Sequence, residues 1–266
     1  MTRTTTRRAR ELPQTSPADA RRNLTGEYAA LTATVDALTP DDWARPTDCE
    51  GWRIRHMVAH LAGSAECSAR PPALIRHYGY ALWHSRKDLA TFVDHMCVSQ
   101  IASRERLGDP ELAADLRRWA SDAPAKLEAT PGLLRRLPIP AAAGGPHGVR
   151  MSWFLDVINT RDVWLHRVDL ARALGQPRPT TVADQEAVAQ VIRDLDTDWS
   201  GPPLTLTLTG PGGGTWHLGE GAPLAHVTED AVAYCRLLSG RSDECTLATE
   251  GDAAGSVALR SARVLF

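Results

Sequence analysis

The hydrophobic pattern of the chain changes once, near residue 200, and this change limits the folds that the sequence can adopt. Before it, apolar residues recur at the spacing of an amphipathic helix, as at Leu24, Tyr28 and Leu31. After it, residues 204–209 alternate strictly between leucine and threonine, which is the period of a half-buried strand. A glycine-rich turn and a second alternating run follow directly and predict a hairpin. The chain is therefore expected to have the α+β fold class, with a helical domain followed by a small α/β domain.

Three segments are predicted along the chain. Residues 1–15 are expected to form a disordered basic tail, because arginines concentrate in the first ten residues and a short charged end is usually solvated. Residues 16–199 form the helical domain. Residues 200–266 form the small C-terminal α/β domain, which begins at the Ser-Gly-Pro-Pro stretch where the period changes.

Start and stop signals divide the helical domain. Ser16 followed by Pro17 gives an N-cap and a first-turn proline, and Gly175 gives a C-terminal cap. Residues 138–149 are rich in proline and glycine and are expected to form a loop. The predicted helical segments run from Pro17 to before Pro40, from Ile54 to about Ala65, over 83–104, from Asp109 onward, over 152–174, and around Val188–Leu195.

Charge and composition exclude several classes of function. A formal charge of −2 does not provide the basic footprint of a nucleic-acid-binding protein. The sequence has no apolar run of about 18 residues, and its basic start lacks the apolar segment of a secretory signal, so we expect a cytoplasmic protein with no membrane partner. Five widely spaced cysteines without a C-x-x-C pair predict neither a disulfide framework nor a thiolate zinc site.

The longest predicted helix carries polar groups on the stripe that should be buried. At about 100° per residue, His166 and Asp169 fall within about 40° of Asp162, together with apolar Leu155 and Ile158. A buried carboxylate must be paired, hydrogen-bonded or bound to a cation, because burying it alone costs several kcal/mol. Asp162 and His166 stand one helical turn apart, a spacing that allows both to bind one ion.

His60 is the candidate third ligand, because it interrupts an apolar segment of another helix. Two imidazoles and one carboxylate, with one position left open, compose a catalytic rather than a structural zinc site. Other interpretations stay open at this point. Asp162 and His166 can form a surface pair, and His60 can be a core histidine with one hydrogen bond. His56 can also pair with His60 at i, i+4, and Asp169 can either orient a ligand or form a salt bridge.

Two segments of the sequence resemble a known family. Residues 51–63 (GWRIRHMVAHLAG) and 161–170 (RDVWLHRVDL) are similar to the signatures of the mycothiol-dependent maleylpyruvate isomerase family, within the DinB-like metal-binding bundles. Residues 38–43 (LTPDDW) and 237–241 (LLSGR) resemble further segments of the same family, so the resemblance covers most of the chain.

The resemblance implies a DinB-like four-helix bundle with a small C-terminal α/β domain. It also implies a divalent metal, with zinc as the first choice, held by His60, Asp162 and His166. Mycothiol is implied as the thiol cosubstrate. Arg241 matches an arginine that faces the metal cavity in the isomerase, and a guanidinium there suits a substrate carboxylate. The alternative is a helix-end arginine that interacts with the helix dipole.

The sequence departs from the isomerase at two positions. The isomerase has a glutamate where this chain has Asp162, and it has an arginine near residues 96–98, where this chain has Met-Cys-Val. The second difference removes a substrate contact and weakens the case for maleylpyruvate as the substrate.

These observations predict a metal-dependent enzyme. We expect it to use a low-molecular-weight thiol for isomerisation or thiol transfer on a small, electrophilic, anionic substrate, with the metal favouring the thiolate at neutral pH. Two alternatives are a tailoring enzyme of secondary metabolism that uses no thiol, and a non-catalytic metal-binding regulator. The expected partners are small molecules only, and the protein is expected to be a monomer or a homodimer.

Overall fold

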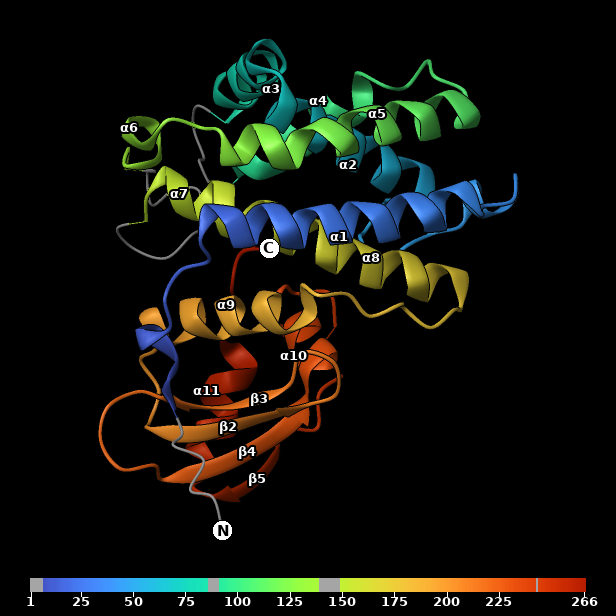
Figure 1. The fold of residues 1–266 in the computed structure, drawn as a ribbon. Helices are drawn as coiled ribbons and strands as arrows, with labels where there is room; N and C mark the ends of the chain where they lie inside the picture. The colour runs from blue at the N-terminus through green and yellow to red at the C-terminus, as the bar shows by residue number, and fades with distance from the viewer. Residues whose placement is uncertain (1–6, 86–90, 139–148, 243) are drawn as a thin grey trace. The chain divides into compact units, whose positions relative to one another are not determined.

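The computed structural model describes residues 7–85, 91–138, 149–242 and 244–266 (Figure 1). Its described residues form two compact units, a helical unit over 16–183 and a sheet unit made of 7–15 and 184–266. Within the described ranges, no helix has both the length and the apolar character needed to cross a membrane. The predicted α+β fold class is confirmed.

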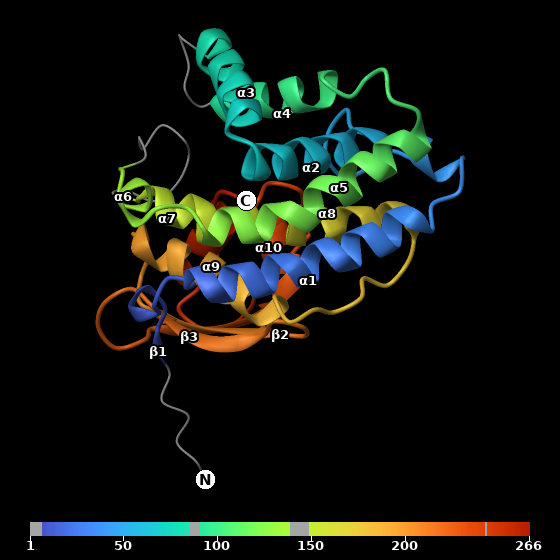
Figure 2. The same cartoon turned by 45° about the horizontal axis from the view of Figure 1, so that its top comes forward.

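Four helices of the helical unit share one hydrophobic core. They are α1 (Pro17–Asp36), α2 (Ile54–Ala69), α5 (Asp109–Glu128) and α8 (Asn159–Leu174). The side chains that meet between them include Leu24, Leu31, Met57, Val58, Leu61, Leu112, Leu116, Val163 and Leu170, all of them buried. Figure 2 shows α3 (Pro71–His84) and α4 (Phe92–Ala102) next to each other beside α2.

Local signals set the ends of these helices. The Ser16 side chain accepts the backbone N–H of Asp19 and caps α1, and Pro17 takes the first helical position. Gly175 ends α8 in the left-handed region at φ +66°, where a residue with a Cβ would be strained. Shorter segments are η2 (Asp42–Ala44), α6 (Gly132–Arg135), α7 (Met151–Trp153) and the π-helical turn η5 (Phe154–Ile158) that leads into α8.

The helical region predicted over residues 83–104 contains α4 and the end of α3. The prediction missed most of α3, which begins at Pro71, twelve residues before the predicted start. The first-turn prolines of α3 are compatible with a helix start, but Ile75 and Trp83 are 71% and 64% exposed, so its apolar residues do not form a single buried stripe. The loop predicted for 138–149 lies outside the described residues except at its two ends.

The sheet unit contains a mixed five-stranded sheet in the order β1-β3-β2-β4-β5. The strands are β1 (Arg7–Arg8), β2 (Leu204–Thr209), β3 (Gly214–Leu218), β4 (Ala225–Asp230) and β5 (Ala248–Gly251). The predicted hairpin is present as the antiparallel pair β2 and β3, whereas β4 pairs with β2 in parallel. The helices of this unit are α9 (Asp184–Thr197), α10 (Ala231–Leu238) and α11 (Ala254–Ser261), with the short η1 (Ala9–Glu11) near its start.

The predicted segment boundaries differ from the structure at two places. Helix α9 was expected in the bundle but belongs to the sheet unit, where Val188, Val191 and Ile192 are fully buried. Residues 7–15 are ordered against α9 rather than disordered: the backbone N–H of Arg10 donates to Asp196, and side chains of α9 donate to the carbonyls of residues 12 and 13. These hydrogen bonds explain why the basic segment does not behave as a solvated tail. Residues 1–6 lie outside the described ranges.

Candidate metal site

Helices α2 and α8 bring together the three side chains that the sequence singles out. Asp162 and His166 lie one turn apart on α8, and His60 faces them from the middle of α2. Nε2 of His60 lies 3.4 Å from Oδ2 of Asp162, and Nε2 of His166 lies 3.4 Å from Oδ1 of the same carboxylate. One ligand atom from each residue lies within 4.8 Å of the other two. This spacing lets a single cation contact all three groups.

The outer nitrogen of each imidazole has a polar partner. Nδ1 of His60 lies 2.8 Å from Oε1 of Gln100, and Nδ1 of His166 lies 3.2 Å from Oδ2 of Asp169. Both acceptors favour a proton on Nδ1, so each ring directs its Nε2 toward Asp162. The donor set of two Nε2 atoms and a carboxylate, with both rings oriented from behind, fits a zinc-type divalent cation.

The site is buried, and each of its three side chains changes the pKa of its neighbours. Burial by itself would lower the pKa of His60, but the facing Cys97 and Asp162 raise it to about 10. Burial likewise opposes the charge of His166, yet Asp162 and Asp169 raise its pKa well above the ordinary value. The pKa of Asp162 is held below its ordinary value, because the two imidazoles outweigh the effect of burial. Protons and a cation therefore compete for the same Nε2 atoms, and metal affinity is expected to weaken as the pH falls.

Comparison with known proteins identifies the family. The family model described as the mycothiol maleylpyruvate isomerase N-terminal domain matches residues 24–171, more than half of the chain. The chain belongs to this family. The matched segment runs from α1 to α8 and includes His60, Asp162 and His166.

Relatives of the chain are similar over most of their length. Two uncharacterized proteins, MT0041 and Rv0036c, from two strains of Mycobacterium tuberculosis, are each 25% identical to it over 241 residues, which is 85% of this chain and 86% of theirs. The crystal structure of mycothiol-dependent maleylpyruvate isomerase matches with a TM-score of 0.53 at 18% identity, covering 90% of this chain and 95% of that one. A histidine-to-alanine mutant of that enzyme matches with a TM-score of 0.55 at 17% identity, over 88% and 92% of the two chains. At this identity the structural matches show a shared fold.

Three further residues contact the two imidazoles. Gln100 and Cys97, both on α4, face His60, and Trp52 lies against both imidazoles with ring centroids 5.3 and 5.8 Å away. The close approach of α4 to α2 is possible because residue 63 is a glycine: a Cβ there would lie 2.6 Å from Cβ of Gln100. The sequence gives only a weak signal for Gln100, because Asp94, His95 and Ser99 also interrupt the apolar residues of α4.

Two further candidates, His56 and Arg241, do not belong to this ligand cluster. His56 accepts the backbone N–H of Arg53 at the start of α2, and it belongs to neither ligand cluster found in the described part of the chain. Arg241 follows Gly240 directly after α10, in the sheet unit, where its backbone N–H donates to the carbonyl of Arg236. Its role toward a substrate carboxylate stays a prediction.

Gln100→Leu is expected to weaken metal binding by roughly 10- to 100-fold, the usual effect of losing a partner that orients a metal-binding histidine. Leucine fills a similar volume but cannot accept the Nδ1–H of His60. Competition with a chromophoric chelator measures the affinity. Gln190→Leu is the matched control, since Gln190 is equally buried, at 3% exposed, but lies in the sheet unit. Equal affinity in the two variants would remove Gln100 from the site.

Proposed function

We propose that the protein is a metal-dependent enzyme that uses a low-molecular-weight thiol of the mycothiol class. Its substrate is a small anionic electrophile, which the enzyme either isomerises or joins to the thiol. Family membership and the fold shared with mycothiol-dependent maleylpyruvate isomerase support a function of this kind. The observation that carries the proposal is the convergence of His60, Asp162 and His166 on one point.

The chain's own residues supply the binding and the orientation. His60, Asp162 and His166 would hold the cation, while Gln100 and Asp169 fix the two rings. A divalent cation in such a site supplies Lewis acidity and lowers the pKa of a bound thiol. The Trp52 indole stacks against the ring of His166 and lies at an angle to the ring of His60.

The thiol is proposed to come from a small molecule, for which a reduced cytoplasm is the suitable compartment. All five cysteines of the chain lie in the described ranges and are free thiols, which suits that compartment. Cys97 faces His60 in the region where the isomerase is expected to carry an arginine. A thiol cannot pair with a carboxylate as a guanidinium does, so we propose a substrate other than maleylpyruvate.

Metal analysis and a thiol-dependent assay test the proposal. Protein purified without chelator is expected to carry about one divalent ion per chain, and Asp162→Asn should lose most of it, because an amide is a weaker ligand than a carboxylate. The wild type is then incubated with mycothiol and a panel of small unsaturated carboxylates and analysed by mass spectrometry. A product heavier by one thiol indicates transfer, and a rearranged product of unchanged mass indicates isomerisation.

His56→Ala is the matched control, since His56 lies one turn before His60 and outside the cluster. This variant should retain both metal and turnover. Turnover that needs metal but no thiol would replace the proposal with a thiol-free enzyme. Metal without any turnover across the panel would favour a regulator.

A further inference from the structure

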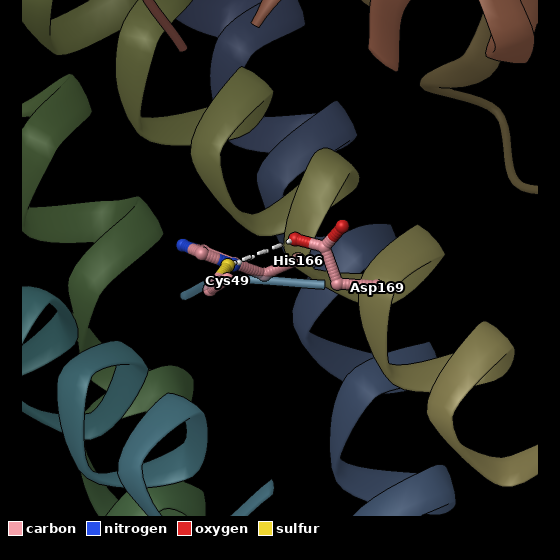
Figure 3. A group of neighbouring side chains, drawn as sticks. All are labelled: Cys49, His166 and Asp169. Carbon is pink, nitrogen blue, oxygen red and sulfur yellow. Dashed lines mark hydrogen bonds and ion pairs between the residues drawn. The ribbon is translucent and has the colours of Figure 1, made fainter. Parts of the chain in front are cut away.

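A second group of ligand atoms lies behind His166, on the side of the ring that faces away from Asp162. It consists of Cys49 Sγ, His166 Nδ1 and Asp169 Oδ2, all within 4.8 Å of one another. Figure 3 shows Cys49, from the loop before α2, next to the two residues of α8. The thiol lies 3.5 Å from the Asp169 carboxylate and 4.0 Å from Nδ1 of His166.

The loop that carries Cys49 is held in a defined conformation. The backbone N–H of Cys49 donates to Oγ1 of Thr47, and the backbone N–H of Trp52 donates to the carbonyl of Cys49. Gly51 allows the turn at φ +75°. Next to Cys49, the Asp48 carboxylate accepts from the Arg172 guanidinium at 2.7 Å, which attaches the loop to the last turn of α8. The thiol is therefore positioned over α8 by the fold of the loop.

Two polar groups converge on one carboxylate oxygen in this cluster. The Cys49 thiol donates to Oδ2 of Asp169, and Nδ1 of His166 lies 3.2 Å from the same oxygen, in a side chain that is fully buried. A cation with a preference for sulfur can bind between these groups, because thiolate, imidazole nitrogen and carboxylate oxygen are the donor types that bind zinc and its softer relatives. Binding would form one bond to each of the three atoms. The thiol proton would leave to solvent, and the imidazole proton would move from Nδ1 to Nε2, so that the ring stays neutral.

We infer that Cys49, His166 and Asp169 form a second binding site, for a thiophilic divalent cation such as zinc or cadmium, distinct from the His60–Asp162–His166 site. The two sites share His166 through opposite ring nitrogens. A cation bound at the second site would break the hydrogen bond between Nδ1 of His166 and Asp169, which orients the His166 ring. Its occupancy thus couples to the first site, while its thiolate ligand gives it a spectroscopic signature of its own.

Titration with Cd²⁺ alone tests this site, because a cadmium–thiolate bond produces a charge-transfer absorbance in the ultraviolet. Wild type and Asp162→Asn are both expected to develop this band, since Asp162 belongs only to the first site. Cys49→Ser should lose the band entirely. Asp169→Asn, which keeps the size of the side chain, should retain the band but require at least 10-fold more Cd²⁺ to reach half of it.

Cys97→Ser is the matched control, because Cys97 is also half-buried and lies against His60 at the first site. It should keep the full band. A band that disappears in Cys97→Ser and survives in Cys49→Ser would overturn the inference, and so would equal Cd²⁺ affinity in Asp169→Asn and wild type. Failure of the proposed enzyme function is a separate result, since it concerns turnover with mycothiol and leaves the cadmium–thiolate band unchanged.

Discussion

His166→Ala is expected to abolish the metal binding and the turnover that we propose, while keeping the helical fold. The variant removes one of three ligands outright, so the loss of affinity should exceed the roughly 10- to 100-fold cost of removing an outer partner. The core shared by α1, α2, α5 and α8 does not include His166, so the fold should persist. Asp169 loses the Nδ1–H that it accepts, which should cost about 1–3 kcal/mol of stability. Metal content after dialysis, circular dichroism and a thermal melt measure these effects.

His226→Ala provides the comparison for this variant. His226 is exposed on β4 of the sheet unit and contacts Oγ1 of Thr207 rather than either ligand cluster of the described residues. It should keep full metal content and an unchanged helical signal. Full metal occupancy in His166→Ala would contradict the ligand assignment, and with it the proposed chemistry.

Local signals in the sequence were enough to predict most individual elements. Ser16 with Pro17 and the left-handed Gly175 mark helix ends that depend only on neighbouring residues. The assignment of α9 failed for a different reason. Its amphipathic pattern shows that one face is buried, but Val188 and Val191 carry no information about which unit covers that face. Long-range pairing, such as β1 with β3, is equally invisible in the local pattern.

The candidate site divides in the same way. Asp162 and His166 were predictable because helical geometry places them on one face whatever the rest of the chain does. His60 required the assumption that a second helix packs against that face. The sequence pattern did not mark Gln100 or Cys49 as site residues. The apolar residues of α4 do not form a clear helical stripe, and the loop before α2 has no periodic pattern. Their roles depend on tertiary packing between elements far apart in the sequence.

The second large effect is expected at a buried ion pair between α1 and α8. The Arg167 guanidinium donates to Glu27 at 2.7 Å, and the two side chains are only 2% and 0% exposed. Arg167 also donates to the carbonyl of Pro179, and Thr181 donates to Glu27, so the pair holds the segment after α8 as well. Arg167→Met should lower the free energy of unfolding of the helical unit by about 3–5 kcal/mol, because Glu27 keeps a buried charge without its cation.

Urea denaturation, with hydrogen exchange to locate the effect in α1 and α8, measures this loss. Arg172→Met is the control, since its ion pair with Asp48 is partly exposed, at 52% and 32%, and should cost no more than about 1 kcal/mol. If the uncompensated charge is the cause, the double variant Glu27→Leu/Arg167→Met should recover most of the stability, because well-packed apolar residues can replace a buried pair. A double variant as unstable as Arg167→Met alone would show that packing of the long arginine side chain, rather than charge, stabilises the contact between α1 and α8.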